Sequence, residues 1–131
     1  MQALVLDRWE ITMKVKVFDS ELKIMEALWR HGDLTAGQLS KTLKAEIGWS
    51  PNTTYTVIGK LVDKGAVERY GTNFSCRPLI TKEEVQQYET TELVGKLFDG
   101  SSTAFLSAFL SGKELSQEEI ANLKQLVDKL K

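Results

Sequence analysis

Trp49–Gly65, with the sequence WSPNTTYTVIGKLVDKG, predicts a helix that is capped at both ends. Ser50 is a favoured N-cap, and Pro51 suits the first helical position because its missing N–H is not needed there. Gly65 is a typical C-terminal stop. At about 100° per residue, four side chains fall within one narrow arc and should face the core. These are Thr54, Val57, Ile58 and Leu61.

The opposite face of this helix carries small or hydrogen-bonding residues. Its members are Asn52, Thr53, Tyr55, Thr56, Gly59 and Lys60. Short polar side chains near a helix N-terminus are suited to contact base edges in the major groove of DNA. An ordinary amphipathic helix with a solvated outer face has the same pattern, so the flanking sequence must decide between the two.

Upstream of this helix the sequence predicts two more helices. The first covers residues 20–30, has Asp19 or Ser20 as its cap and Gly32 as its stop. Its apolar stripe is Leu22, Met25, Leu28 and Trp29. The second opens with Thr35-Ala36-Gly37-Gln38, a capping box, and is short, because a loop over residues 44–49 leads to Ser50. Its inward residues are Ala36, Leu39 and Leu43.

Downstream of Gly65 the sequence predicts a β-hairpin. Residues 66–70 and 74–78 have the composition of short strands, and Gly71-Thr72-Asn73 has that of a turn. Residues 14–18 could add a third strand. Three helices followed by a hairpin wing predict a mainly α fold, the winged helix-turn-helix.

Three segments resemble the BlaI/MecI/CopY family of transcriptional repressors. They are SELKIMEALW, LTAGQLSKTL and WSPNTTYTVIGKLVDKGAVER, and the similarity runs from about Val17 to Lys131. The resemblance implies an N-terminal winged helix, a C-terminal helical dimerisation region, and repression through operator binding as a homodimer. Two features depart from the family pattern: Tyr55 stands where many members have a basic residue, and the cysteine-rich metal tail of the copper-sensing branch is absent.

The helix pattern and the resemblance together predict the residues that contact DNA. Upstream of the wing they are Lys41, Lys44, Ser50, Asn52, Thr53, Tyr55, Thr56 and Lys60; in the wing they are Thr72, Asn73 and either Arg69 or Arg77. Gly59 costs about 1 kcal/mol relative to alanine in a helix interior. Close approach to DNA would explain it, and so would packing against a neighbouring element.

Residues 81–131 predict three helices with more apolar surface than they can bury alone. The first runs from Thr81 to about Phe98, the second over Ser101–Ser111, and the third follows the capping box at Ser116–Glu119. About fifty residues give too small a core, so a two-fold partner is the economical way to cover them. The alternative is that they fold back on their own winged helix. The predicted interface residues are Leu97, Phe98, Phe105, Leu106, Phe109, Leu110, Ile120, Leu123, Val127 and Leu130.

The predicted domains are therefore a DNA-binding domain over residues 13–80 and a dimerisation region over residues 81–131. Residues 1–12 would be an upstream extension, a cloning remnant or a misassigned start. The first domain holds ten Lys or Arg against seven Asp or Glu, and the second holds six against nine. A mildly basic part beside an acidic part is compatible with a DNA-reading head on a dimerisation stem.

In the family, repression is relieved by metal binding or by a membrane sensor protease that cuts an Asn-Phe pair before a Leu-Ser-x-x-Glu-Ile segment. Here Leu115–Ile120 matches that segment, and the aligned pair is Ala108-Phe109. The asparagine is replaced. Phe109 also suits an interface core, whether or not this bond is cut.

The remaining sequence gives no support for catalysis, cofactors or metals. His31 lies alone at a helix end, and Cys76 lies alone in the second wing strand, so one chain can form neither a disulfide nor a thiolate metal site. No run of about 18 apolar residues and no secretory signal is present, so we expect a cytoplasmic protein with no membrane insertion. The alternatives are a winged helix used only for protein–protein contact and, within the regulators, an activator or metal-responsive protein.

Overall fold

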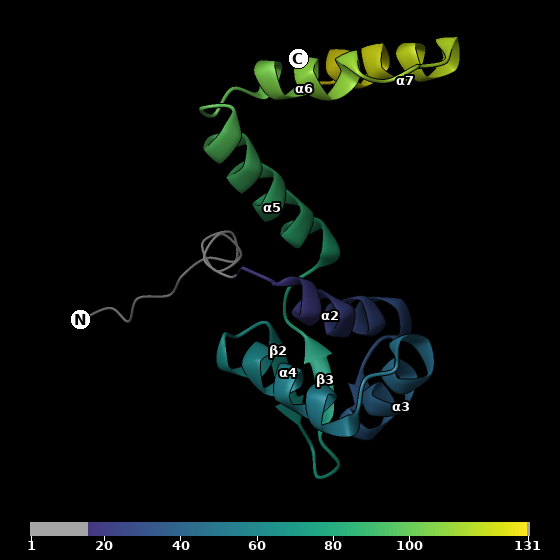
Figure 1. The fold of residues 1–131 in the computed structure, drawn as a ribbon, viewed down its shortest axis with the longest axis vertical. Coiled ribbons are helices and arrows are strands. Elements are labelled where there is room, and N and C mark those ends of the chain that lie inside the picture. The colour runs from purple at the N-terminus through teal and green to yellow at the C-terminus, as the bar shows by residue number, and fades with distance from the viewer. Residues whose placement is uncertain (1–15, 131) are drawn as a thin grey trace, which may run out of the picture. The chain divides into compact units, whose positions relative to one another are not determined.

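The computed structural model describes residues 16–130, which form helices and one small antiparallel sheet (Figure 1). The chain divides into two compact units after Thr91, within helix α5 (Lys82–Leu97). The predicted N-terminal segment, residues 1–12, lies outside the described residues.

The first unit contains the three helices and the hairpin of a winged helix-turn-helix, as the sequence predicts. The helices are α2 (Asp19–His31), α3 (Ala36–Ile47) and α4 (Pro51–Asp63). The loop that joins the two strands of the wing projects beyond the helices (Figure 1). The mainly α fold class is confirmed.

The start of α2 differs from the sequence prediction. The N-cap is Phe18, not Asp19 or Ser20. The backbone N–H of Phe18 donates to Glu21 Oε1 at 2.8 Å, so the Glu21 side chain satisfies a donor at the helix start from within the first turn. The end is as predicted, because Gly32 has φ +82° and its N–H donates to the Leu28 carbonyl.

Helix α3 begins as predicted but is longer. Thr35 Oγ1 accepts from the Gln38 N–H at 3.1 Å, and Gln38 Oε1 accepts from the Thr35 N–H at 2.9 Å. The helix continues to Ile47, into the predicted loop over residues 44–49. Gly48, at φ +75°, ends it in the left-handed conformation that favours glycine.

The sheet has three strands in the order β1-β3-β2, both pairs antiparallel. The strands are β1 (Leu34–Thr35), β2 (Val67–Tyr70) and β3 (Ser75–Pro78). The hairpin is confirmed, with each strand one residue shorter than predicted. The prediction that residues 14–18 supply the third strand is wrong for the described residues 16–18, which form no strand. Leu34–Thr35 pairs with β3 instead.

The core of the first unit lies between the helices and the sheet. All four residues of α4 that the sequence predicts to face inward are buried, namely Thr54, Val57, Ile58 and Leu61. Met25 and Leu28 of the α2 stripe are buried, whereas Leu22 and Trp29 are half-buried against the core. Val85, from the first part of α5, joins the same cluster. The largest fully buried side chains are Ile24, Met25, Leu28, Leu39, Leu43, Leu61, Val67, Thr54 and Cys76.

Among the described residues, one ion pair of this unit is partly buried. Glu21 of α2 has a side chain only 3% exposed, and Lys64, which follows α4, donates from Nζ to Glu21 Oε1 at 2.6 Å. Lys64 Nζ also donates to the Lys16 carbonyl at 2.8 Å. These contacts tie the C-terminal end of α4 to the start of α2.

The second unit contains the end of α5, helix α6 (Ser102–Ser111) and helix α7 (Gln117–Asp128). Ser101 caps α6, and the predicted capping box of Ser116 and Glu119 is present at α7. No residue of α6 or α7 is buried. Within the described residues, no helix is both long and apolar enough to cross a membrane.

Candidate nucleic-acid interface

The outer face of α4 is exposed along its length. Asn52, Thr56 and Lys60 are exposed, and within residues 16–130 their side chains make no hydrogen bond or ion pair. Tyr55 is also exposed, and no acidic residue lies in the first turn. The fold thus fixes this helix by its inner face and leaves the outer donors and acceptors available.

The start of α4 is held by a serine cap. Ser50 Oγ accepts from the Thr53 N–H at 3.2 Å and lies 3.0 Å from Thr53 Oγ1. Thr53 therefore belongs to the cap as well as to the exposed face, which separates it from Asn52 and Thr56. Pro51 has no N–H, and the N–H groups of Thr53 and Thr54 donate to Ser50, so in the first turn the Asn52 N–H is left to favour an anion.

Helix α3 contributes exposed cations. Lys41 and Lys44 are exposed, and neither makes an ion pair within the described chain. The first turn of α3 contains no acidic residue. Thr35 and Gln38 occupy two of its N-terminal groups through the capping box.

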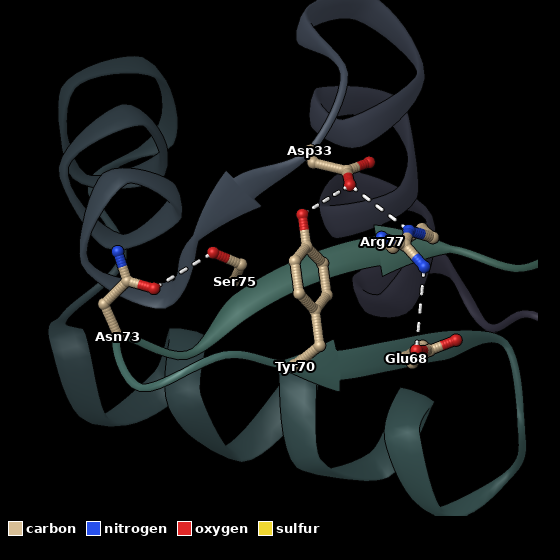
Figure 2. Close-up of polar contacts among 6 residues, drawn as sticks. All are labelled: Asp33, Glu68, Tyr70, Asn73, Ser75 and Arg77. Atoms are coloured by element: carbon tan, nitrogen blue, oxygen red, sulfur yellow. Dashed lines mark hydrogen bonds and ion pairs between the residues drawn. The ribbon is translucent and has the colours of Figure 1, made fainter.

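The tip of the wing presents polar side chains. Thr72 and Asn73 are exposed in the turn between β2 and β3. Ser75 Oγ donates to Asn73 Oδ1 at 3.2 Å, so the carboxamide NH₂ group is left as a donor (Figure 2). This orientation suits contact with an acceptor such as a phosphate oxygen.

The two wing arginines, which the sequence could not distinguish, have different surroundings. Arg77 lies over the Tyr70 ring and donates from Nε to Asp33 Oδ2 at 3.3 Å, and its NH1 lies 3.7 Å from Glu68 (Figure 2). Tyr70 OH donates to the same Asp33 oxygen at 2.7 Å. Hydrogen bonding to Asp33, above all, raises the pKa of Arg77. Two carboxylates therefore already engage this guanidinium.

Arg69 has no such partner. It is exposed, makes no ion pair among residues 16–130, and places its guanidinium 4.7 Å from the centroid of the Phe74 ring. Phe74 is 53% exposed and has φ +52°, which is unusual for a residue other than glycine. Phe74 is not among the residues predicted to contact DNA. An aromatic residue directly after a Gly-Thr-Asn turn was the signal that could have found it.

Cys76 is a residue of the hydrophobic core. It is fully buried in β3, and burial raises the pKa of its thiol, with Arg69 opposing this shift. Among residues 16–130 no group of three or more His, Cys, Asp or Glu side chains could hold a metal ion.

The second unit has a separate apolar surface. A groove of about 480 Å³ lies between the end of α6 and helix α7. Its apolar lining is Leu110, Leu115, Ile120, Leu123 and Val127. Phe98, Phe105 and Phe109 form a row in which neighbouring ring centroids are 5.6 and 5.9 Å apart. Ala108 and Phe109, the aligned cleavage pair, are both exposed on α6.

The sequence model of the penicillinase repressor family matches residues 18–129. The chain belongs to this family. The penicillinase repressor of Bacillus licheniformis is 27% identical over 118 residues, which cover 88% of this chain and 92% of the relative. The methicillin resistance regulatory protein MecI of Staphylococcus aureus strain N315 is 23% identical over 116 residues, covering 87% and 94%.

Solved structures include two of the repressor BlaI. The solution structure of its DNA-binding domain has a TM-score of 0.49 and 28% identity, covering 52% of this chain and 85% of that chain. The structure of monomeric Bacillus licheniformis BlaI with the blaP half-operator has a TM-score of 0.47 and 29% identity, covering 53% and 88%. The family membership confirms the resemblance drawn from the sequence.

Proposed function

We propose that this chain is a sequence-specific DNA-binding transcriptional repressor. The observation that carries the proposal is the outer face of α4, where exposed Asn52, Thr56 and Lys60 have no partner within residues 16–130. The match to the penicillinase repressor family, and a relative named as a penicillinase repressor, support it. In this proposal Asn52, Tyr55 and Thr56 contact base edges, and Lys60 lies on a phosphate.

The surrounding elements would hold the DNA backbone. The first turn of α4, capped by Ser50 with Thr53, would take a phosphate at its N-terminus. Lys41 and Lys44 would add sequence-independent charge from α3. Thr72 and Asn73 would contact phosphate or the adjacent minor groove from the wing. Phosphate contacts of this kind fix position, whereas the base contacts of α4 fix sequence.

The repressor would act as a homodimer through the second unit. Helices α6 and α7 have no buried residue, and no described residue of the unit covers their apolar groove. A two-fold partner covers identical faces at once. Two tethered heads raise overall affinity by roughly 10²–10⁴, because the second binds at high effective concentration. Two-fold symmetry in the protein would be matched by an inverted repeat, with half-site centres about 10 base pairs or a multiple apart.

Selection from a random duplex pool tests the DNA-binding proposal. The full chain should enrich an inverted repeat, and the enriched duplex should outcompete a scrambled one. Weak binding that is lost in salt, with no enriched sequence, would contradict it and favour a winged helix that serves only protein–protein contact.

A matched pair of α7 variants tests the dimer. Val127 is 56% exposed and apolar, whereas Gln125 is an exposed polar residue of the same helix. Val127→Asp and Gln125→Asp add the same charge, and neither should unfold the chain. By sedimentation at micromolar concentration, the parent and Gln125→Asp should be dimers, and Val127→Asp a monomer. A monomeric parent would contradict the homodimer. It would favour the alternative in which the C-terminal helices fold back on their own winged helix.

Relief of repression would follow cleavage at Ala108-Phe109 by a membrane sensor protease. Cutting there removes α7 and part of the apolar row of α6 but leaves the DNA-reading face intact. A chain that ends at Ala108 should therefore be monomeric and bind the selected inverted repeat roughly 10²–10⁴ times more weakly than the parent. Parental affinity in that chain would show that the second unit does not support repression.

A further inference from the structure

The wing and α4 enclose a groove of about 340 Å³ in the first unit. Its lining comes from the start of α3, the outer edge of α4 and the tip of the wing. The lining includes Gly37, Tyr55, Gly59, Arg69, Asn73 and Phe74. The groove is therefore continuous with the face of α4 described above.

Phe74 has an unusual backbone conformation that packing of its side chain in the core does not explain. Its carbonyl accepts from the Ala36 N–H at 2.9 Å, which joins the wing to the start of α3. Its φ of +52° costs conformational free energy that glycine would avoid. The ring gains little burial in return, since the residue is 53% exposed. A strained backbone that presents an exposed ring at a groove points to a ligand.

The charge of the groove is positive. Arg69 has no carboxylate partner among the described residues, and its guanidinium lies over the Phe74 ring. The start of α3 adds partial positive charge from its backbone and has no acidic side chain in its first turn. Arg77, by contrast, is engaged by Asp33 and Glu68 (Figure 2). The occupant should therefore be an anion that also presents an apolar surface to the ring.

Gly59 lies in the wall that α4 contributes. A Cβ added there would meet nothing within 4 Å, so no neighbouring atom requires glycine at this position. The packing explanation for Gly59 is thereby weakened. What remains is close approach by something other than the described residues.

We propose that this groove holds the sugar–phosphate backbone of one DNA strand, with Arg69 on a phosphate and Phe74 against the adjoining deoxyribose. The inference rests on the proposed function. If α4 lies in the major groove and the wing tip meets the adjacent minor groove, the strand that separates the two grooves must pass between α4 and the wing.

Two wing arginines provide a matched test. Binding of Arg69→Gln and Arg77→Gln to the selected duplex is measured by fluorescence anisotropy over a series of salt concentrations. Arg69→Gln should lose about tenfold in affinity, and its log–log salt slope should fall by about one, because one phosphate contact is lost. Arg77→Gln should match the parent in both. Equal behaviour of the two variants would overturn the proposal.

Phe74→Gly and Gly59→Leu complete the test without depending on a fragile fold. Glycine accepts φ +52°, so Phe74→Gly should unfold at the same or higher urea concentration while binding the duplex about fivefold more weakly. Gly59→Leu should keep the fold and lose at least as much affinity. Parental affinity of Phe74→Gly, or of Arg69→Gln, would overturn the groove assignment. If Asn52→Ala still weakens binding in that case, the role of α4 stands. If the parent binds no duplex at all, both the groove assignment and the DNA-binding role of α4 are wrong.

Discussion

Replacing Lys64 by Met should destabilise the first unit far more than an ordinary ion-pair deletion. Glu21 Oε1 accepts from Lys64 Nζ at 2.6 Å and from the Phe18 N–H at 2.8 Å, and the Glu21 side chain is 3% exposed. Methionine keeps an unbranched stem of similar length but removes the ammonium group. The Glu21 carboxylate then keeps one donor and has no opposite charge.

The expected cost follows from the burial of the two partners. Leaving a buried charge uncompensated costs about 3–5 kcal/mol. The Lys64 side chain is 25% exposed, so water reaches its end of the pair and we expect the lower end, about 3 kcal/mol. In a chain of this size that lowers Tm by roughly 10–15 °C. Urea unfolding followed by circular dichroism, at one fixed protein concentration, measures the free energy of unfolding.

Arg30→Met is the matched control. Arg30 pairs with Glu46 at 2.9 Å, but both side chains are exposed, so its loss should cost less than about 1 kcal/mol. Glu21→Gln should fall between the two, because its amide oxygen still accepts from Phe18 and Lys64 can turn toward water. If Lys64→Met costs no more than Arg30→Met, the burial argument is refuted.

Three further predictions concern separate parts of the first unit. Lys60→Ala should weaken binding to every duplex alike and lower the salt slope by about one in anisotropy titrations, because Lys60 is assigned to a phosphate. Thr54→Val should raise the free energy of unfolding by about 1 kcal/mol without changing DNA affinity, since the buried Thr54 hydroxyl has no hydrogen-bond partner in the described structure. Burial raises the pKa of the Cys76 thiol, so the unfolded chain loses this proton at lower pH than the folded chain. The stability advantage of the parent over Cys76→Ala in urea titrations should therefore shrink as the pH rises above the ordinary thiol pKa of about 8.5. A constant difference would contradict that assignment.

The features predictable from the sequence are those set by local chemistry. Ser50, Thr35 and Ser116 cap their helices as predicted, since a cap depends on residues three positions apart. The buried face of α4 follows from helical periodicity. The two-residue strand β1 could not be predicted, because a pair of residues is too short to show alternation.

The features that the sequence could not give depend on contacts between distant residues. In the sequence Glu21 is one of two acids in a first helical turn, and only the fold brings Lys64, distant in sequence, to pair with it. The sequence does not distinguish Arg69 from Arg77 as a DNA contact. The fold does, because it places Asp33 beside Arg77, where the two side chains form an ion pair. The position of Phe74 beside the start of α3 depends on the hydrogen bond that the Ala36 N–H donates to its carbonyl.

The central claim is that the outer face of α4 reads DNA sequence. Its most direct test is the affinity of the parent, Asn52→Ala and Thr56→Ala for the selected duplex and for duplexes with single base-pair changes. Each variant should lose on the order of 1–3 kcal/mol on the selected duplex and discriminate less at one or two base pairs, while unfolding at the parental urea concentration. Parental affinity and parental discrimination in both variants would show that this face does not read the bases.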